Sequence, residues 1–224
     1  MSYDQLRSEV CELNIDLQRY GLVAWTAGNV SARVPGENVF IIKPSGVMYK
    51  DLAPTNMVVC DLEGNVIEGD LSPSSDTATH AYIYRNMPEV HGVVHTHSNF
   101  ASAWAAAHRS IPCALTAMGD EFGGDIPLGP FALIGGEEIG KVVVETLKNS
   151  RSTAVIMANH GVFTIGKNAT FAVKSAVMCE DVAKTMYYAQ SLGPINPISQ
   201  ENIDSLYYRY QNIYGQRQSE SESK

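Results

Sequence analysis

Three histidines are spaced as ligands of a metal ion. His95 and His97 stand two residues apart in Val93-Val-His-Thr-His97, within a β-branched run that predicts a strand. Alternate residues of a strand share a face, so both imidazoles project the same way from a rigid platform. His160 lies between two further strand-like runs, in Ala158-Asn-His-Gly161. Three imidazoles leave an open position on zinc or another divalent first-row metal, which is the pattern of a catalytic site.

Each of these features also has a plainer interpretation. A lone His-x-His motif is often an ordinary polar pair at a strand end, and a histidine before Gly161 is typical of a turn. Asp76 follows Ser74-Ser75 and precedes a predicted helix, so it is a candidate fourth ligand. It is also a standard helix N-cap, an interaction worth about 1 kcal/mol. His80, within that helix, is interpreted as structural.

Three short segments carry groups that bind oxyanions. They are Thr26-Ala-Gly-Asn-Val-Ser31, Lys43-Pro-Ser-Gly46, and Ser74-Ser75 at the start of a predicted helix. Glycine allows the backbone to approach an anion, and serine hydroxyls and helix N-terminal N–H groups donate hydrogen bonds to it. Lys43 adds a positive charge. Each segment alone is typical of a turn, but together they predict an anionic ligand.

The elements that must position these residues mix helices with short strands. Periodicity predicts helices at 6–20, 77–87, 101–108, 137–149, 168–192 and 199–214, and strands at 39–42, 57–61, 66–68, 90–96, 111–116, 153–158 and 162–165. The early strands are joined by tight turns, without a regular βαβ alternation. We therefore expect an α/β fold in which a mostly antiparallel sheet lies between helices. No glycine-rich dinucleotide or P-loop motif is present.

Composition limits the class of protein. The chain has 224 residues, of which 45% are hydrophobic, and a formal net charge of −8. These values predict one domain, residues 1–216, with a polar and disordered tail at 217–224. The acidic balance argues against nucleic-acid and membrane partners, and no apolar run approaches a membrane span. Widely spread cysteines and an N-terminus unlike a signal peptide predict a cytoplasmic location.

The motifs together resemble the class II aldolase/adducin family. They are Gly28-Asn-Val-Ser31, Lys43-Pro-Ser-Gly46, Pro73-Ser-Ser-Asp76 followed by His80, His95-Thr-His97 and Asn159-His-Gly161, in this order. The resemblance runs from about residue 6 to about residue 217, and five ordered motifs are far more specific than any one. It implies a single three-layer α/β domain and a homotetramer with active sites at the subunit interfaces.

The resemblance also implies the ligands of the site and a phosphorylated sugar as substrate. A zinc-type metal, Zn²⁺ or another divalent first-row ion such as Mn²⁺, would be held by Asp76, His95, His97 and His160. The substrate and its phosphate would be bound by Gly28, Asn29, Lys43, Ser45, Gly46, Ser74 and Ser75.

Two aspartates, Asp76 and Asp120, favour an epimerase within this family, and Tyr214 supports membership of the family. Family members that cleave L-fuculose 1-phosphate carry a glutamate base where this chain has Asp76. Asp120 and Tyr214 match the catalytic acid/base residues of members that convert L-ribulose 5-phosphate to D-xylulose 5-phosphate. Those members use retro-aldol cleavage of the C3–C4 bond followed by recondensation. The resemblance therefore implies an epimerase with Asp120 and Tyr214 as catalytic residues.

Other features favour a class II aldolase as the alternative. Thr26-Ala-Gly28 and the segment 126–132 resemble the aldolases, and residues 206–210 lack a histidine that the epimerases carry before their C-terminal tyrosine. Such an aldolase would cleave a ketose 1-phosphate such as L-fuculose 1-phosphate. A non-catalytic, adducin-like interaction module is disfavoured because the histidines, both aspartates and the tyrosine are all present.

Overall fold

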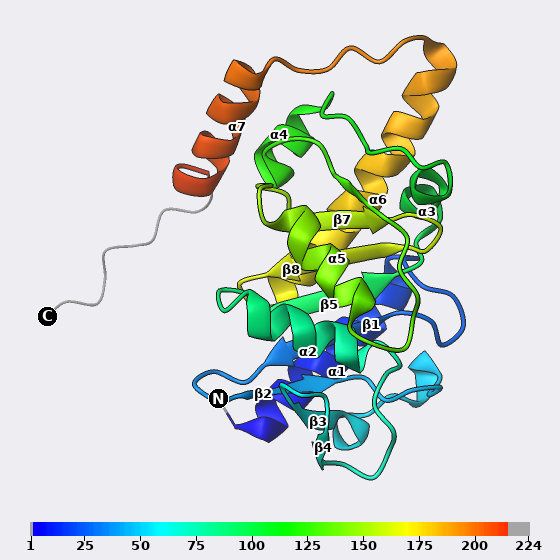
Figure 1. Ribbon diagram of the computed structural model, residues 1–224, viewed down its shortest axis with the longest axis vertical. Helices are drawn as coiled ribbons and strands as arrows, with labels where there is room; N and C mark the ends of the chain where they lie inside the picture. Colours follow the sequence, from blue (N-terminus) through cyan, green and yellow to red (C-terminus); the bar gives the residue numbers. More distant parts are fainter. Residues whose placement is uncertain (1, 215–224) are drawn as a thin grey trace, which may run out of the picture.

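The computed structural model describes residues 2–214 (Figure 1). The helices are α1 (Tyr3–Arg19), α2 (Thr77–Asn86), α3 (Asn99–Ala106), α4 (Thr116–Phe122), α5 (Glu138–Leu147), α6 (Ala169–Leu192) and α7 (Gln200–Asn212), with short 3-10 turns at Tyr49–Asp51 and Pro54–Asn56. The strands are β1 (Asn29–Arg33), β2 (Val39–Ile42), β3 (Val58–Asp61), β4 (Val66–Glu68), β5 (Gly92–Thr96), β6 (Leu128–Gly129), β7 (Ala154–Met157) and β8 (Val162–Gly166). The predicted tail, residues 217–224, lies outside the described residues.

All of these strands belong to one eight-stranded sheet. Their order is β4-β3-β2-β1-β5-β8-β7-β6. Neighbouring strands are antiparallel except β6 and β7, which are parallel. The predicted, mostly antiparallel sheet is therefore confirmed. It places β5, which carries His95, in the middle of the sheet between β1 and β8.

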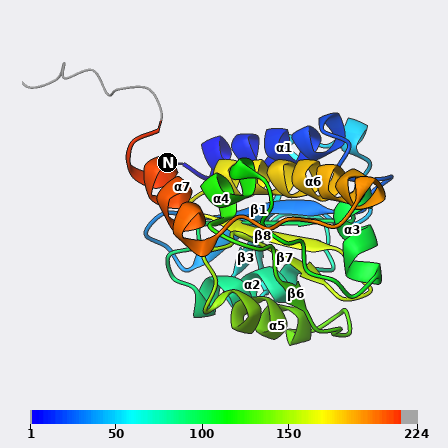
Figure 2. The same cartoon turned by 90° about the horizontal axis from the view of Figure 1, so that it is seen from above.

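Helices cover both faces of this sheet (Figure 2). Helices α1 and α6 lie on one face, and α2 and α5 lie on the other. Side chains alternate along β5, so the strand contributes to the core on both faces of the sheet. Val94 packs beneath α1 and α6, and Val93 packs beneath α2 and α5. A third cluster joins α3, α4 and α7 to α6. The fold is a single-domain, three-layer α/β structure, as predicted.

One buried asparagine fixes β1 against α1. The Asn14 side chain accepts a hydrogen bond from Val30 N at 2.9 Å and donates to Val30 O at 3.2 Å and to Val10 O at 2.8 Å. Asn14 is fully buried, so its amide can be satisfied only by these backbone groups. This contact holds the start of β1, where Asn29 lies.

The sequence patterns missed two strands and misplaced one. Strand β1 carries buried polar residues, so it lacks an apolar alternation, and β6 has only two residues. The strand predicted at 111–116 is wrong. Only Ile111 pairs, with Ile126, and Thr116 already begins α4. Pro112 has no N–H to donate, and the N–H of Cys113 donates to the Asp125 side chain, so no ladder continues past Ile111.

Two further sequence expectations concern thiols and membranes. All four cysteines are buried free thiols, as their spacing predicted. Burial raises the pKa of the Cys60 thiol to about 12 and that of Cys113 to about 11, so neither is a reactive thiolate near neutral pH. Within residues 2–214, no helix has both the length and the apolar character needed to cross a bilayer.

Candidate metal centre and substrate cavity

Pairing of β5 with the β7–β8 hairpin brings the three histidines together. His95 is in β5, His97 follows it, and His160 lies in the turn before β8. Their ligand atoms all lie within 4.8 Å of one another, and the Nε2 atoms of His95 and His97 are 2.9 Å apart. Nitrogens bound to tetrahedral zinc at 2.0–2.1 Å stand about 3.3 Å from each other. The spacing of the three imidazoles therefore suits a divalent metal.

Hydrogen bonding and burial prepare His95 as a ligand. Its Nδ1 lies 2.9 Å from the carbonyl oxygen of Val162, which can only accept, so Nδ1 carries the proton and Nε2 keeps its lone pair. Burial lowers the pKa of His95 to about 3 and also lowers the pKa of His160. Both imidazoles are therefore neutral at pH 7, which is the form that binds a metal.

Asp76 lies beside this cluster as an ionised carboxylate. Burial by itself would raise its pKa, but His95, His80 and the amide of Asn29 outweigh that effect, and the pKa is below its usual value. Its Oδ2 accepts a hydrogen bond from Asn29 Nδ2 at 2.7 Å. Asp76 is the N-cap residue of α2, yet its side chain makes no cap hydrogen bond. The carboxylate is turned toward the site instead, so the cap interpretation does not account for it.

The histidines line a cavity of about 310 Å³. All of the predicted metal ligands and substrate-binding residues line this cavity: Gly28, Asn29, Lys43, Ser45, Gly46, Ser74, Ser75, Asp76, His95, His97 and His160. Strand register explains part of this assembly, because Asn29 of β1 stands opposite His95 of β5. An isolated bridge between Pro44 and Pro73 brings the other two predicted anion segments side by side.

Lys43 places a buried positive charge in the cavity wall. The residue is 2% exposed, and its Nζ donates to the carbonyl oxygens of Thr26 at 3.1 Å and Pro44 at 3.4 Å. The ammonium also lies 5.1 Å from the ring centroid of Tyr49. Burial lowers the pKa of Lys43 to about 8, although the charge of Asp76 opposes the shift. No carboxylate of the described residues pairs with it, so an anionic ligand would complete its environment.

Gly28 in the cavity wall and Gly161 beside the histidines leave no room for a side chain. Gly28 has a φ of +81°, and a Cβ there would lie 2.5 Å from Cγ1 of Val23. At Gly161 a Cβ would lie 2.5 Å from the carbonyl oxygen of Thr96 and 2.7 Å from Cδ2 of His97. The turn that carries His160 therefore packs directly against the other two histidines because residue 161 is a glycine.

His80 belongs to a polar chain that sequence reasoning treated only as structural. It is fully buried, and its Nδ1 lies 2.7 Å from Oγ of Ser31, which lies 2.7 Å from the hydroxyl of Tyr84. Burial lowers the pKa of His80 to about 4, so the ring is neutral. Its Nε2 and the Oδ1 of Asn29 are buried without a hydrogen-bond partner among residues 2–214. Polar groups left unpaired beside a cavity fit a site that receives a ligand.

The two residues predicted as acid and base lie outside this cavity. Among the described residues, Asp120 and Tyr214 are not part of the cavity lining. Asp120 of α4 forms an ion pair with Arg209 of α7 at 3.2 Å, and Tyr214 follows α7 with 66% of its surface exposed. Both views place α7 on the opposite side of the molecule from α3, the helix that follows His97 (Figures 1 and 2). The fold thus brings Asp120 and Tyr214 to one arginine, outside the cavity of their own chain.

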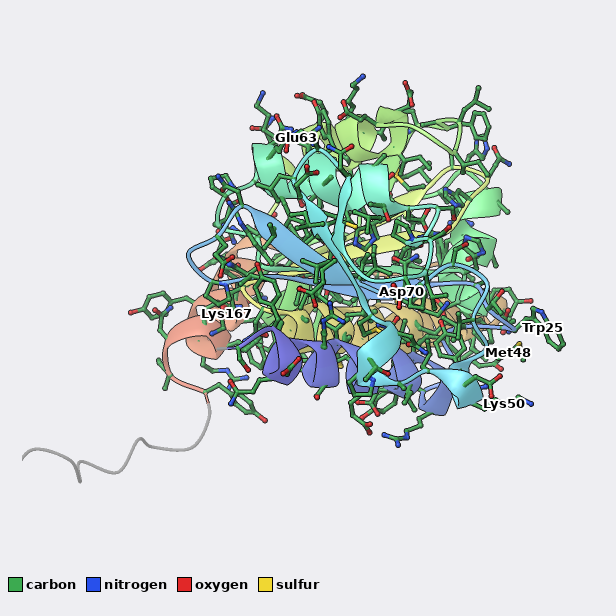
Figure 3. All side chains as sticks on the ribbon, turned by 90° about the horizontal axis from the view of Figure 1, so that it is seen from below. Trp25, Met48, Lys50, Glu63, Asp70 and Lys167 are labelled. Atoms are coloured by element: carbon green, nitrogen blue, oxygen red, sulfur yellow. The ribbon has the colours of Figure 1, made fainter. Side chains whose placement is uncertain are left out.

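Exposed apolar side chains surround the cavity, and sequence reasoning did not single them out. Ile134 lines the cavity and is 72% exposed. Trp25, which precedes the lining residue Thr26, is 78% exposed and projects at the same end of the molecule as Met48 (Figure 3). Large apolar groups at a cavity rim are typical of a surface that another molecule covers. The only sequence signal was their position in loops rich in glycine.

A comparison with protein families decides the membership of the chain. Residues 8–187 match the class II aldolase and adducin N-terminal domain. The chain belongs to this family. The match spans the motif segments of the cavity and all three histidines, so the resemblance inferred from the sequence is confirmed.

Solved structures of other class II aldolase proteins share this fold. An L-fuculose 1-phosphate aldolase is 23% identical, with a TM-score of 0.87 over 92% of this chain and 96% of that chain. YgbL, a putative aldolase/epimerase/decarboxylase from Escherichia coli, is 26% identical, with a TM-score of 0.79 over 91% of this chain and 98% of that chain. The L-fuculose-1-phosphate aldolase from Thermus thermophilus is 27% identical, with a TM-score of 0.71 over 86% of this chain and 99% of that chain.

Proposed function

We propose that the protein is a metal-dependent sugar-phosphate epimerase that converts L-ribulose 5-phosphate to D-xylulose 5-phosphate. The observation that carries the proposal is the division of its polar groups into two sets. His95, His97, His160 and Asp76 line one cavity. Asp120 and Tyr214, the proposed acid and base, both contact Arg209 away from that cavity. An epimerase that works by bond cleavage needs both sets.

The substrate explains why bond cleavage is needed. The C4 hydrogen of L-ribulose 5-phosphate is not acidic, so direct deprotonation cannot invert that centre. Removing the proton of the C4 hydroxyl instead breaks the C3–C4 bond and releases an aldehyde, glycolaldehyde phosphate. A divalent metal such as zinc or manganese, held by the three histidines and Asp76, would stabilise the negative charge that develops on the ketone side during this cleavage.

The residues of the cavity hold the phosphate while the aldehyde group rotates to present its other face. Lys43 supplies the positive charge, and the Ser45, Ser74 and Ser75 hydroxyls and the backbone at Gly28 and Gly46 supply donors. Asn29 holds Ser74 Oγ at 2.9 Å as well as Asp76, so it links the phosphate wall to the metal ligands. Retention of the phosphate would favour recondensation over escape of the aldehyde.

Two proton carriers are required because the hydroxyl is deprotonated and reprotonated on opposite faces. A carboxylate and a phenol can each exchange a proton with a bound hydroxyl, so Asp120 and Tyr214 suit these roles. Since they lie away from their own cavity, we propose that they reach the cavity of a neighbouring subunit in a homotetramer. The exposed rim residues Trp25 and Ile134 support this arrangement, because a neighbour would cover them.

A class II aldolase for L-fuculose 1-phosphate is the second candidate. The names of two of the similar structures favour it, since both are L-fuculose 1-phosphate aldolases. The chemistry is the same up to release of the aldehyde, so both candidates use the same metal and phosphate groups. In the aldolase Asp76 would have to act as the base in place of a glutamate.

Proton NMR of the zinc-loaded protein separates the candidates. The epimerase proposal predicts that L-ribulose 5-phosphate is converted to D-xylulose 5-phosphate without free aldehyde. In the D120N and Y214F variants, conversion should fall at least about 100-fold while zinc remains bound. Cleavage of L-fuculose 1-phosphate without conversion of the pentose phosphate would establish the aldolase, and turnover of neither sugar would reject both.

A further inference from the structure

One guanidinium joins the two residues proposed as acid and base. Arg209 Nη2 donates to Oδ1 and Oδ2 of Asp120 at 3.3 and 3.2 Å. The guanidinium carbon of Arg209 also lies 5.6 Å from the ring centroid of Tyr214. Tyr214 N donates to the carbonyl oxygen of Arg209 at 3.0 Å, which folds the chain back after α7. The three side chains therefore form one group at the junction of α4 and α7.

A second set of contacts anchors this group to the body of the protein. The ring of Tyr210 stacks on Tyr214, with centroids 5.1 Å apart and planes 25° apart. Lys174 Nζ of α6 donates to the hydroxyl of Tyr210 at 2.6 Å and to Glu121 at 2.6 Å. The Glu121 side chain is only 8% exposed. Tyr214 is thus in contact with an anchored ring and with Arg209.

We propose that Arg209 is a positioning residue that sets the separation of the Asp120 carboxylate and the Tyr214 ring. An arginine stays protonated at any pH at which the protein folds, so Arg209 cannot itself carry the proton. Its Nη2 instead holds the carboxylate while the guanidinium lies over the phenol ring. The acid and the base would then enter the neighbouring cavity as a preformed pair. This inference rests on the proposed catalytic roles of Asp120 and Tyr214.

The chain offers a matched control for this arginine. Arg151 forms an ion pair with Asp204 of α7 at 2.6 Å, and its guanidinium carbon lies 5.4 Å from the ring centroid of Tyr207. The exposed fractions of the two arginine side chains are also similar, 46% for Arg151 and 48% for Arg209. Both pairs therefore dock the same helix by the same kind of contact. The partners of Arg151 are Asp204 and Tyr207, not the proposed acid and base. Replacing Arg151 therefore weakens the docking of α7 without removing a contact to Asp120 or Tyr214.

The test compares R209Q, R209K and R151Q with D120N and Y214F in the zinc-loaded protein. We measure kcat and KM on the sugar phosphate that the wild type converts, together with Tm and bound zinc. R209Q should lower kcat by about 10- to 100-fold with little change in KM, because displacement of a reacting group by about 1 Å has this effect. R209K should recover part of the loss. R151Q should lower Tm as much as R209Q and keep kcat.

A double variant links the effect to the carboxylate. R209Q should cause a smaller loss in a D120N background than in the wild type, since the carboxylate that Arg209 holds is then already absent. Equal kcat losses in R209Q and R151Q would overturn the inference, as would a loss in R209Q that appears in KM alone. Full activity of both D120N and Y214F would overturn the proposed function and this inference with it. Loss of activity in D120N and Y214F but not in R209Q would overturn only the inference.

Discussion

Lys43 shows how the fold prepares a single side chain for an anion. Its ammonium is buried, its hydrogen-bond acceptors are backbone carbonyls, and burial lowers its pKa to about 8. A lysine with a lowered pKa is charged below that pKa and neutral above it. The positive charge in the cavity is therefore present at pH 7 and is lost as the pH rises through about 8.

This titration predicts a pH-dependent affinity for the phosphate group. KM for the sugar phosphate should rise between pH 7 and 9, because the phosphate stays dianionic while Lys43 loses its proton. K43M should raise KM at pH 7 by about 10- to 100-fold, the effect expected from losing a charge-assisted hydrogen bond, and should flatten the pH profile. K141M is the control, since Lys141 is exposed on α5 and does not line the cavity. A KM of K43M equal to that of the wild type would contradict the role of Lys43.

Strand and helix patterns predicted several of the residues that the structure brings to one cavity, for physical reasons. The pair His95 and His97 could be placed on one face because strand periodicity fixes the direction of side chains. Asp76 could not be separated from a helix N-cap by its neighbours, since Ser and Asp before a helix serve both purposes. The structure separates them because the carboxylate bonds to Asn29, a residue 47 positions earlier in the chain.

At the scale of elements, the β7–β8 hairpin decides whether the histidines can converge. Its turn places Asn159 at a φ of 57° and packs Gly161 against Thr96 and His97. Asparagine tolerates this left-handed conformation better than most residues. The position of His160 is therefore set by its two sequence neighbours.

The variant G161A tests this element without removing a ligand. The added methyl group would collide with the Thr96 carbonyl and the His97 ring, so the three nitrogens should move apart. We expect zinc affinity to fall at least about tenfold, as for changes that support ligands indirectly. G36A is the control for a destabilising glycine substitution outside the site, because Gly36 has a φ of +79° and open space around it. Chelator competition measures the affinity, and unchanged zinc binding in G161A would contradict the account.

Strands were harder to predict where they are short or carry buried polar residues. Most helices and the β3–β4 hairpin follow from periodicity and from the turn at 62–65. Strand β1 could not be found that way, because Asn29 and Ser31 are buried polar residues that bond to the cavity wall and to His80. The strand predicted at 111–116 failed because Pro112 cannot donate to a ladder and the N–H of Cys113 bonds to the Asp125 side chain.

At the scale of the whole molecule, the cavity and the proposed acid/base residues lie on different sides of one chain. No sequence pattern could show this, because it depends on where α7 docks after the segment 193–199. The arrangement predicts that active sites are shared between subunits. A closed ring of four identical subunits would repeat the same contact, in which one subunit gives the cavity and the next gives Asp120 and Tyr214.

Mixed tetramers test this sharing. D120N subunits retain the histidines, and H97A subunits retain the acid/base pair, so each homotetramer should be inactive. Random 1:1 hybrids should recover about a quarter of the wild-type activity, since about one interface in four of a closed ring combines two intact halves. Light scattering confirms the tetramer, and hybrids that remain inactive although they assemble would contradict the shared site.

The most direct test of the central claim is a zinc titration of the metal-free protein, with bound zinc and sugar-phosphate turnover measured in the same samples. Turnover should rise in proportion to bound zinc and level off at about one ion per chain. H97A should bind zinc weakly and remain inactive. H91A should behave as the wild type, because His91 precedes β5 at the end away from His95 and His97. Turnover by the zinc-free protein, or full zinc binding and activity in H97A, would contradict the account.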